Sequence, residues 1–92
     1  MNRTLLNIPY NLSDENWQQI DAIYRAMPGW KGYVHGSPQW HLPSGYSVVA
    51  MVEPKGLCFE TLSSERDLSV WLCEFMFRAS EALGFSVQNT HT

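Results

Sequence analysis

Residues 63–85 read SSERDLSVWLCEFMFRASEALGF, and this stretch has the clearest helical period in the chain. Ser64 is a favoured helix N-cap residue, and the acidic Glu65 and Asp67 suit the positive end of the helix dipole. Gly84 follows the last periodic residue and favours the left-handed conformation that ends many helices. The stretch therefore predicts a long helix that begins after Ser64 and ends at Gly84.

Two apolar stripes run along this helix. The first predicts the core face and recurs at three- and four-residue spacing, with Leu68, Trp71, Leu72, Phe75, Met76, Ala79 and Leu83 as its members. The second, which we call the outer stripe, lies on roughly the opposite side and consists of Val70, Cys73 and Phe77. The polar residues Asp67, Glu74, Arg78 and Glu81 lie between the stripes, and Glu74 and Arg78 have the spacing of an ion pair. Two interpretations of the outer stripe stay open: a loop or terminus covers it, or it contacts a partner.

The rest of the chain predicts a second helix and several strands. Residues 4–10 alternate weakly and predict a first strand that Pro9 confines to an edge or ends. Ser13 is placed to cap a helix that Pro28 and Gly29 stop, with an apolar face of Trp17, Ile20, Ile23, Tyr24 and Met27. Residues 46–53 predict a central strand, residues 54–56 a tight turn and residues 57–62 the returning strand.

The segments between and after these elements are less regular. Residues 30–35 predict a strand, and residues 36–38 and 43–45 predict turns. Residues 85–87 predict a last short strand and residues 88–92 a frayed tail. The whole is an α+β domain over residues 1–92, with a mostly antiparallel sheet of three to five strands and two helices packed against it. The expected order is β-α-β-β-β-α, with the last short strand at the end.

Composition narrows the class of protein. Ninety-two residues, 45% of them hydrophobic, suffice for one folded domain without disulfides or metals. A net charge of −3 argues against general nucleic-acid binding and is compatible with a basic partner. Cys58 and Cys73 form no CxxC pair, so we expect two reduced, buried thiols. No signal peptide is visible and no apolar run approaches the roughly 20 residues that span a bilayer, so we expect a cytoplasmic protein without membrane contact.

No motif indicates catalysis. His35 and His41 lack the short spacing of zinc ligands, even with His91 or Glu53 added, so we expect neither a metal nor another cofactor. GxSxG and the glycine-rich phosphate-binding motifs are absent from the sequence. Glu53 and Glu60 can meet across a hairpin, where neighbouring carboxylates are most often solvated edge residues. We therefore expect no catalytic residues and no enzyme.

The segment 30–46 is rich in aromatic residues. Trp30, Tyr33, Trp40 and Tyr46 alternate with Lys31, His35 and His41, a composition typical of recognition surfaces. The alternative, favoured for most of these residues, is a minor core beneath a long loop. The candidate partner-binding residues are accordingly Val70, Glu74, Phe77 and Arg78 on the helix, and Trp30, Tyr33, Trp40 and His41 in this segment.

Two patterns resemble a known type of protein. Val52-Glu53-Pro54-Lys55-Gly56-Leu57, followed by Trp71-x3-Phe75-x3-Ala79-x3-Leu83-Gly84-Phe85-x-Val87, is similar to sequences of small bacterial immunity proteins of contact-dependent inhibition and related toxin systems. The resemblance covers about the second half of the chain, and it implies a cytoplasmic protein that binds and neutralises a toxin domain. Immunity proteins share a role more than a sequence, so no functional residue is carried over.

The sequence thus predicts a non-enzymatic protein-binding module, most simply an immunity protein. Two alternatives stay open: a small-ligand-binding domain that uses the aromatic segment 30–46, and a homodimer held together by the outer stripe.

Overall fold

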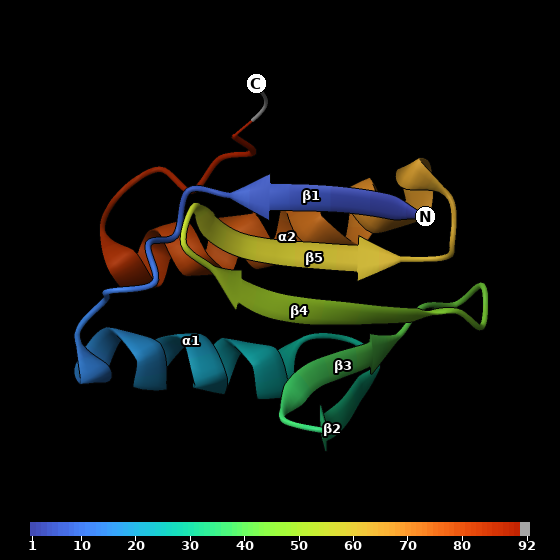
Figure 1. Cartoon of the computed structure of the whole chain (residues 1–92), viewed down its shortest axis with the longest axis horizontal. Coiled ribbons are helices and arrows are strands. Elements are labelled where there is room, and N and C mark those ends of the chain that lie inside the picture. The colour runs from blue at the N-terminus through green and yellow to red at the C-terminus, as the bar shows by residue number, and fades with distance from the viewer. Residues whose placement is uncertain (91–92) are drawn as a thin grey trace.

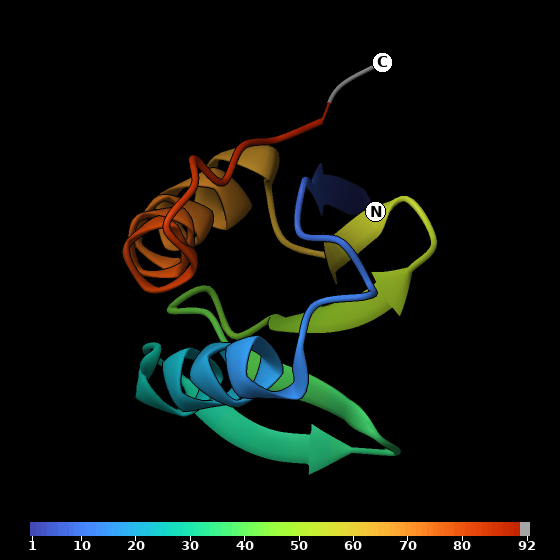
Figure 2. The same ribbon diagram turned by 90° about the vertical axis from the view of Figure 1, so that its left-hand side faces the viewer.

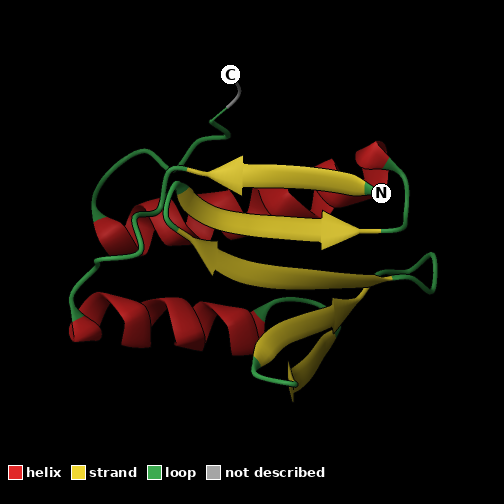
Figure 3. Cartoon of the chain, viewed as in Figure 1, coloured by secondary structure: helices red, strands yellow, loops and turns green. Residues whose placement is uncertain are grey.

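The computed structural model of this chain describes residues 1–90. Its elements are β1 (Asn2–Leu6), α1 (Asp14–Ala26), β2 (Trp30–Val34), β3 (Ser37–His41), β4 (Ser47–Glu53), β5 (Gly56–Thr61) and α2 (Glu65–Leu83). The predicted α+β class, the two helices and the five-strand upper limit are confirmed (Figure 3). One strand more than expected lies between the helices, because β3 occupies residues that the sequence assigned to a turn and an irregular segment.

The five strands form one antiparallel sheet in the order β1-β5-β4-β3-β2 (Figure 1). β4 lies in the middle, as its apolar residues on both faces predicted. The two-residue turn at Pro54 and Lys55 joins β4 to β5, and Glu53 pairs with Gly56 across it. His35 and Gly36, with φ of 52° and 81°, form the turn between β2 and β3. Positive φ at both turn residues matches the twist of a two-residue hairpin, so residues 30–41 form a single β-hairpin.

Both helices pack on the same face of the sheet, which gives the molecule two layers (Figure 2). Each begins at the predicted serine: the hydroxyl of Ser13 accepts a hydrogen bond from the Asn16 amide, and that of Ser64 accepts one from the Asp67 amide. α2 ends at Gly84, whose φ of 78° is left-handed as expected. α1 and α2 contact each other along their sides, and no helix of residues 1–90 lies on the other face of the sheet.

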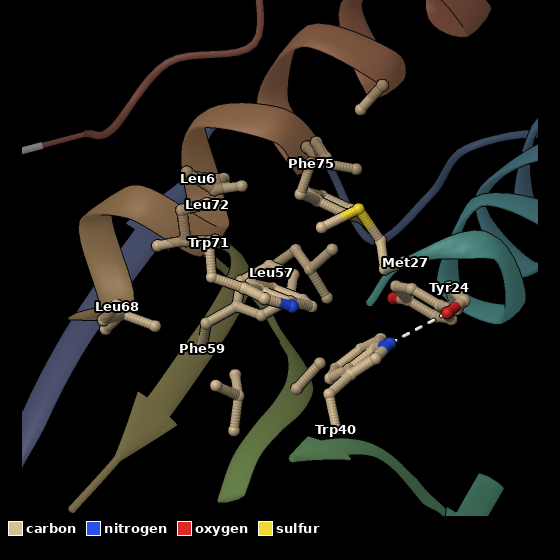
Figure 4. Packing of buried hydrophobic residues seen from close by; sticks show 14 of the residues in the cluster. Leu6, Tyr24, Met27, Trp40, Leu57, Phe59, Leu68, Trp71, Leu72 and Phe75 are labelled. Atoms are coloured by element: carbon tan, nitrogen blue, oxygen red, sulfur yellow. Dashed lines mark hydrogen bonds between the residues drawn. The ribbon is translucent and has the colours of Figure 1, made fainter. Parts of the chain in front are cut away.

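An aromatic cluster fills the space between the layers (Figure 4). Trp40 is fully buried at its centre, with ring centroids 4.7 Å from Trp71 and 6.0 Å from Phe59. The indole N–H of Trp40 donates to the Tyr24 carbonyl at 2.8 Å, so the buried polar atom is satisfied. Phase and position of the predicted α2 core face are confirmed, since Leu68, Trp71, Leu72, Phe75 and Ala79 are buried and Met76 and Leu83 are partly buried.

The segment after α2 returns to β1. The Asn7 amide donates to the Gln88 carbonyl at 3.0 Å, and the Thr90 amide donates to the Leu5 carbonyl at 2.8 Å. The Asn7 side chain holds the same segment, donating to the Ser86 carbonyl and accepting from the Gln88 amide. The expected strand at residues 85–87 is therefore wrong: within the described residues 84–90, the one β-bridge joins Asn89 to Leu6. The expected frayed tail is wrong for residues 88–90, and residues 91–92 lie outside the described chain.

Two glycines allow close contacts between elements. A Cβ on Gly56 would lie 2.2 Å from the Leu6 carbonyl oxygen, and one on Gly29 would lie 2.0 Å from the His41 carbonyl oxygen. Neither distance is physically possible without moving the backbone. Gly56 therefore allows β1 to pack closely beside the β4–β5 hairpin, and Gly29 allows the end of α1 to pack closely against β3.

Candidate protein-binding surface

The outer stripe of α2 is exposed to solvent. The exposed fraction is 67% for both Val70 and Phe77, and Cys73 between them is also exposed. The reason is geometric: the sheet and α1 contact the core side of the helix, and the returning segment 84–90 passes beside β1 instead of over the stripe. Within residues 1–90 the stripe is therefore uncovered, which resolves the two interpretations of its apolar side chains in favour of an open surface. The expected burial of Cys73 is wrong, whereas Cys58 is buried as expected.

Two hollows border the outer stripe. The first is a broad, shallow hollow between the two helices, to which Ala22 and Ala26 of α1 and Phe77 and Ala82 of α2 contribute. The second, which we call the proline pocket, has a volume of about 280 Å³. Its lining comes from three parts of the chain: Met27 and Pro28 after α1, Leu42 and Pro43 after β3, and Asp67, Val70, Trp71 and Glu74 on α2.

An ion pair lies between the two hollows. Arg78 Nη2 is 2.7 Å from Glu74 Oε2, which confirms the spacing argument from the sequence. Both side chains are about half exposed, so the pair contributes only a few tenths of a kcal/mol to folding. Its position is more informative: Glu74 lines the proline pocket and Arg78 lines the hollow with Phe77. The four predicted helix residues Val70, Glu74, Phe77 and Arg78 thus form one surface with two concave regions.

The charge of the molecule is unevenly distributed. The two helices carry seven of the nine acidic residues and three of the six basic residues, a net charge of −4, whereas the strands and loops carry a net +1. The helix layer therefore combines exposed apolar side chains with a negative field. That combination fits a partner whose surface is positively charged.

The aromatic segment does not extend this surface. Trp40 is a core residue with no exposed surface, so its prediction as a partner-binding residue is wrong. The physical reason is the β2–β3 hairpin, which turns the side chain of Trp40 inward beneath the helices. The alternative interpretation, a minor core beneath a long loop, is correct for the burial of Trp40 and wrong for its setting, since Trp40 lies on strand β3 in the main core.

Trp30 and Tyr33 pack against α1. The Arg25 guanidinium lies 5.6 Å from the Trp30 ring centre and 5.8 Å from that of Tyr33. The Tyr33 hydroxyl donates to Asp21, which also accepts from Arg25. Burial, together with this hydrogen bond, raises the pKa of Tyr33 to about 12. The hydrogen bonds from Arg25 and Tyr33 lower the pKa of Asp21. These interactions fix both aromatic rings within the fold, although Tyr33 remains 46% exposed.

Tyr33 also borders a hollow of about 420 Å³ beside β3 and β4, to which Trp17, Pro38 and Val52 contribute. A small ligand that uses the aromatic segment 30–46 could bind in this hollow. His41 lies in β3 with an exposed side chain, and its backbone amide donates to the Gly29 carbonyl at 2.8 Å. None of Trp30, Tyr33 and His41 lines either hollow beside the outer stripe.

Arg3 connects the two carboxylates of the β4–β5 hairpin. Its guanidinium donates to Glu53 at 2.6 Å and to Glu60 at 3.1 Å, on the sheet face without helices. Cys58 lies on β5, two residues before Glu60, and burial raises the pKa of its thiol. Glu53 and Glu60 therefore share the Arg3 guanidinium as their ion-pair partner on the sheet surface.

Among residues 1–90, no three His, Cys, Asp or Glu side chains are placed to hold a metal ion together. His91, which the sequence analysis considered as a third ligand, lies outside the described residues. Neither helix in this part of the chain is long and apolar enough to cross a membrane. No family model, curated protein or solved structure matches the chain.

Sequence reasoning identified the α2 side of this surface and missed the rest. Pro28 and Pro43 were recognised as turn residues, but no periodicity relates them to Val70. The contact becomes visible only when β3 pairs beside β4 and brings residues 42–43 under the first half of α2.

Proposed function

We propose that this protein is a non-enzymatic binding protein, a cytoplasmic immunity protein that covers and neutralises a toxin domain with its helix layer. The observation that carries the proposal is the exposed outer stripe, in which Val70 and Phe77 stand two-thirds exposed between two hollows. Large apolar side chains that border concave regions are typical anchors of protein interfaces.

The charge of the helix layer indicates the chemistry of the partner. Enzymes that act on nucleic acids carry a basic surface that binds phosphates. A helix layer with a net charge of −4 attracts such a surface and accelerates association. We therefore propose a toxin domain with a basic binding face, which the immunity protein blocks by occupying it.

The function is tested with the full chain and the partner that co-purifies with it from the native host. The purified partner must inhibit growth when produced alone, and production of this chain must restore growth. We expect Phe77→Ala to weaken the complex by about 2 kcal/mol or more, roughly thirtyfold, because an exposed anchor loses its contact. Glu74→Lys is expected to slow association and to change its salt dependence.

Leu62→Ala is the matched control. Leu62 is 66% exposed, nearly the same as Phe77, but it lies in the connection between β5 and α2 and lines neither hollow beside the outer stripe. We expect this variant to bind and to restore growth like the wild type. Equal loss for Phe77→Ala and Leu62→Ala, or no loss for either, would contradict a partner site on the outer stripe.

The homodimer alternative uses the same stripe and is separated by mass. If the purified chain doubles its mass with concentration and Phe77→Ala abolishes this change, the stripe is a self-association surface and the immunity proposal is wrong.

A further inference from the structure

The proline pocket is the best-formed concavity beside the outer stripe. Its deep part is apolar, because Met27 and Leu42 are buried and Trp71 is only 7% exposed. Val70 stands at its rim with most of its side chain in solvent. The pocket thus combines an apolar interior with an accessible entrance.

Hydrogen bonds fix all three walls of this pocket. The indole N–H of Trp71 donates to the Pro28 carbonyl at 3.1 Å, which joins α2 to the end of α1. The His41 amide donates to the Gly29 carbonyl, and the Leu42 amide donates to the Tyr46 carbonyl, each at 2.8 Å. A pocket whose walls are already held in place loses little conformational freedom when a group enters it.

The charged groups of the pocket have one sign. Asp67 and Glu74 lie two helical turns apart on the same side of α2, and both line the pocket. Asp67 accepts a hydrogen bond from the neutral Ser63 hydroxyl at 2.6 Å, which leaves its negative charge in place. Glu74 accepts from Arg78, and a carboxylate has about four acceptor sites, so further donors can bind. No basic side chain of residues 1–90 lines the pocket.

We propose that the proline pocket receives one long cationic side chain, arginine or lysine, from the bound partner. The aliphatic part of that side chain lies against Val70, Trp71 and the two prolines, and its charged end lies between Asp67 and Glu74. This inference rests on the proposed function and names the group that anchors the partner beside Phe77.

Size and polarity favour this occupant over others. A volume of about 280 Å³ lies just below the range of about 300–1,000 Å³ for small-molecule sites, so the pocket suits one side chain. Arginine and lysine place an apolar stem on apolar surface while the charge stays at the solvent boundary. A neutral apolar side chain would offer no hydrogen-bond donor to either carboxylate, and an acidic one would be repelled.

The test uses small probes and the full ¹⁵N-labelled chain, without any partner. N-acetyl-arginine amide and N-acetyl-lysine amide are titrated while the protein amide and indole signals are recorded, with the uncharged N-acetyl-citrulline amide as the probe control. We expect the cationic probes to shift the Trp71 indole and Val70 amide signals, and citrulline to bind about threefold to fivefold more weakly. Equal shifts with citrulline, or shifts centred outside the pocket, would overturn the inference.

Variants separate the pocket from the general negative field. Glu74→Gln removes a charge inside the pocket, whereas Glu81→Gln removes the same charge from the same helix outside it. We expect Glu74→Gln, and independently Asp67→Asn, to reduce probe affinity about threefold, and Glu81→Gln to leave it nearly unchanged. An equal effect of Glu74→Gln and Glu81→Gln would show a field effect and refute the pocket.

The two proposals can fail separately. If arginine binds the pocket but no toxin domain is found, the immunity function fails and the cation site stands. If a toxin domain binds through Phe77 while the probes do not shift Trp71, the function stands and the cation site is wrong.

Discussion

Phe75 and Phe77 are two residues apart on α2, and they lie on opposite sides of the helix. Phe75 is fully buried, with ring centroids 4.9 Å from Phe59 and 5.9 Å from Tyr24, whereas Phe77 is 67% exposed. Replacing each in turn by alanine removes the same atoms from the same helix. The pair therefore separates the contribution of the core from that of the outer stripe.

The expected difference is large. Truncation of a buried phenylalanine costs about 3–5 kcal/mol, because apolar contacts are lost and a cavity remains. For a domain of this length 1 kcal/mol shifts the melting temperature by about 4–8 °C, so Phe75→Ala should melt about 12–40 °C lower. Phe77→Ala changes an exposed position, where substitutions usually alter the free energy of unfolding by at most about 0.5 kcal/mol. Its melting temperature should stay within about 4 °C of the wild type.

Thermal unfolding is followed by far-ultraviolet circular dichroism at several protein concentrations. A concentration series is needed because self-association would raise the melting temperature of the wild type and not that of Phe77→Ala. A large loss for both variants would mean that Phe77 is buried in solution, which would refute the exposed stripe and both proposals built on it. A small loss for both would refute the core position of Phe75.

Three further outcomes are expected. Gly56→Ala should lower the free energy of unfolding by about 2 kcal/mol or more, because the new methyl group would clash with the Leu6 carbonyl and alanine disfavours a backbone φ of 149°. An unchanged urea unfolding curve would contradict the close packing of β1 against Gly56. Asn7→Ala should cost about 1 kcal/mol and accelerate amide exchange at Gln88 and Thr90, because two hydrogen bonds to the returning segment are lost; unaltered exchange would show that the side chain does not hold this segment. Tyr33, with its pKa raised to about 12, keeps its proton in the folded protein after the unfolded chain has lost it near pH 10. The protonated Tyr33 hydroxyl therefore contributes its full stabilisation below about pH 10, and this contribution is lost between about pH 10 and pH 12. The free energy of unfolding, measured with urea, should fall less steeply with pH in this range for Tyr33→Phe than for the wild type, and an identical fall would refute the assignment.

The helices could be predicted from the sequence because each carries its own boundary signals. Ser13, Ser64 and Gly84 satisfy backbone groups within a few residues of themselves, so their effect depends little on the rest of the fold. The apolar period of α2 likewise fixed which side chains are buried before any tertiary contact was known. Helix caps and apolar periodicity depend only on residues close together in the chain, so the sequence alone is enough to predict them.

Strand β3 was missed because its local signals indicate a turn. Ser37 and Pro38 are favoured turn residues, and proline lacks the N–H that a central strand normally donates. The structure resolves the conflict through register: β3 pairs with β4 only from Gln39 onward, so the missing N–H of Pro38 costs no hydrogen bond with that strand. Register of this kind depends on partners far away in the sequence.

The candidate surface was half predictable for a related reason. Val70 and Phe77 were found because helical spacing places them together, but their exposure depends on what packs over α2, and a sequence pattern does not contain that information. The proline pocket needs residues 27–28, 42–43 and 67–74 at one place, and only the folded chain brings them together.

The two sides of α2 have an evolutionary consequence. Residues on its inner side hold the fold, so few substitutions there are compatible with a free energy of unfolding of about 5–15 kcal/mol. Changes at Val70, Cys73 and Phe77 cost little stability, since each side chain is largely in solvent. If the outer side of α2 binds a partner as proposed, lineages can exchange one binding specificity for another there, while the inner side preserves the same scaffold.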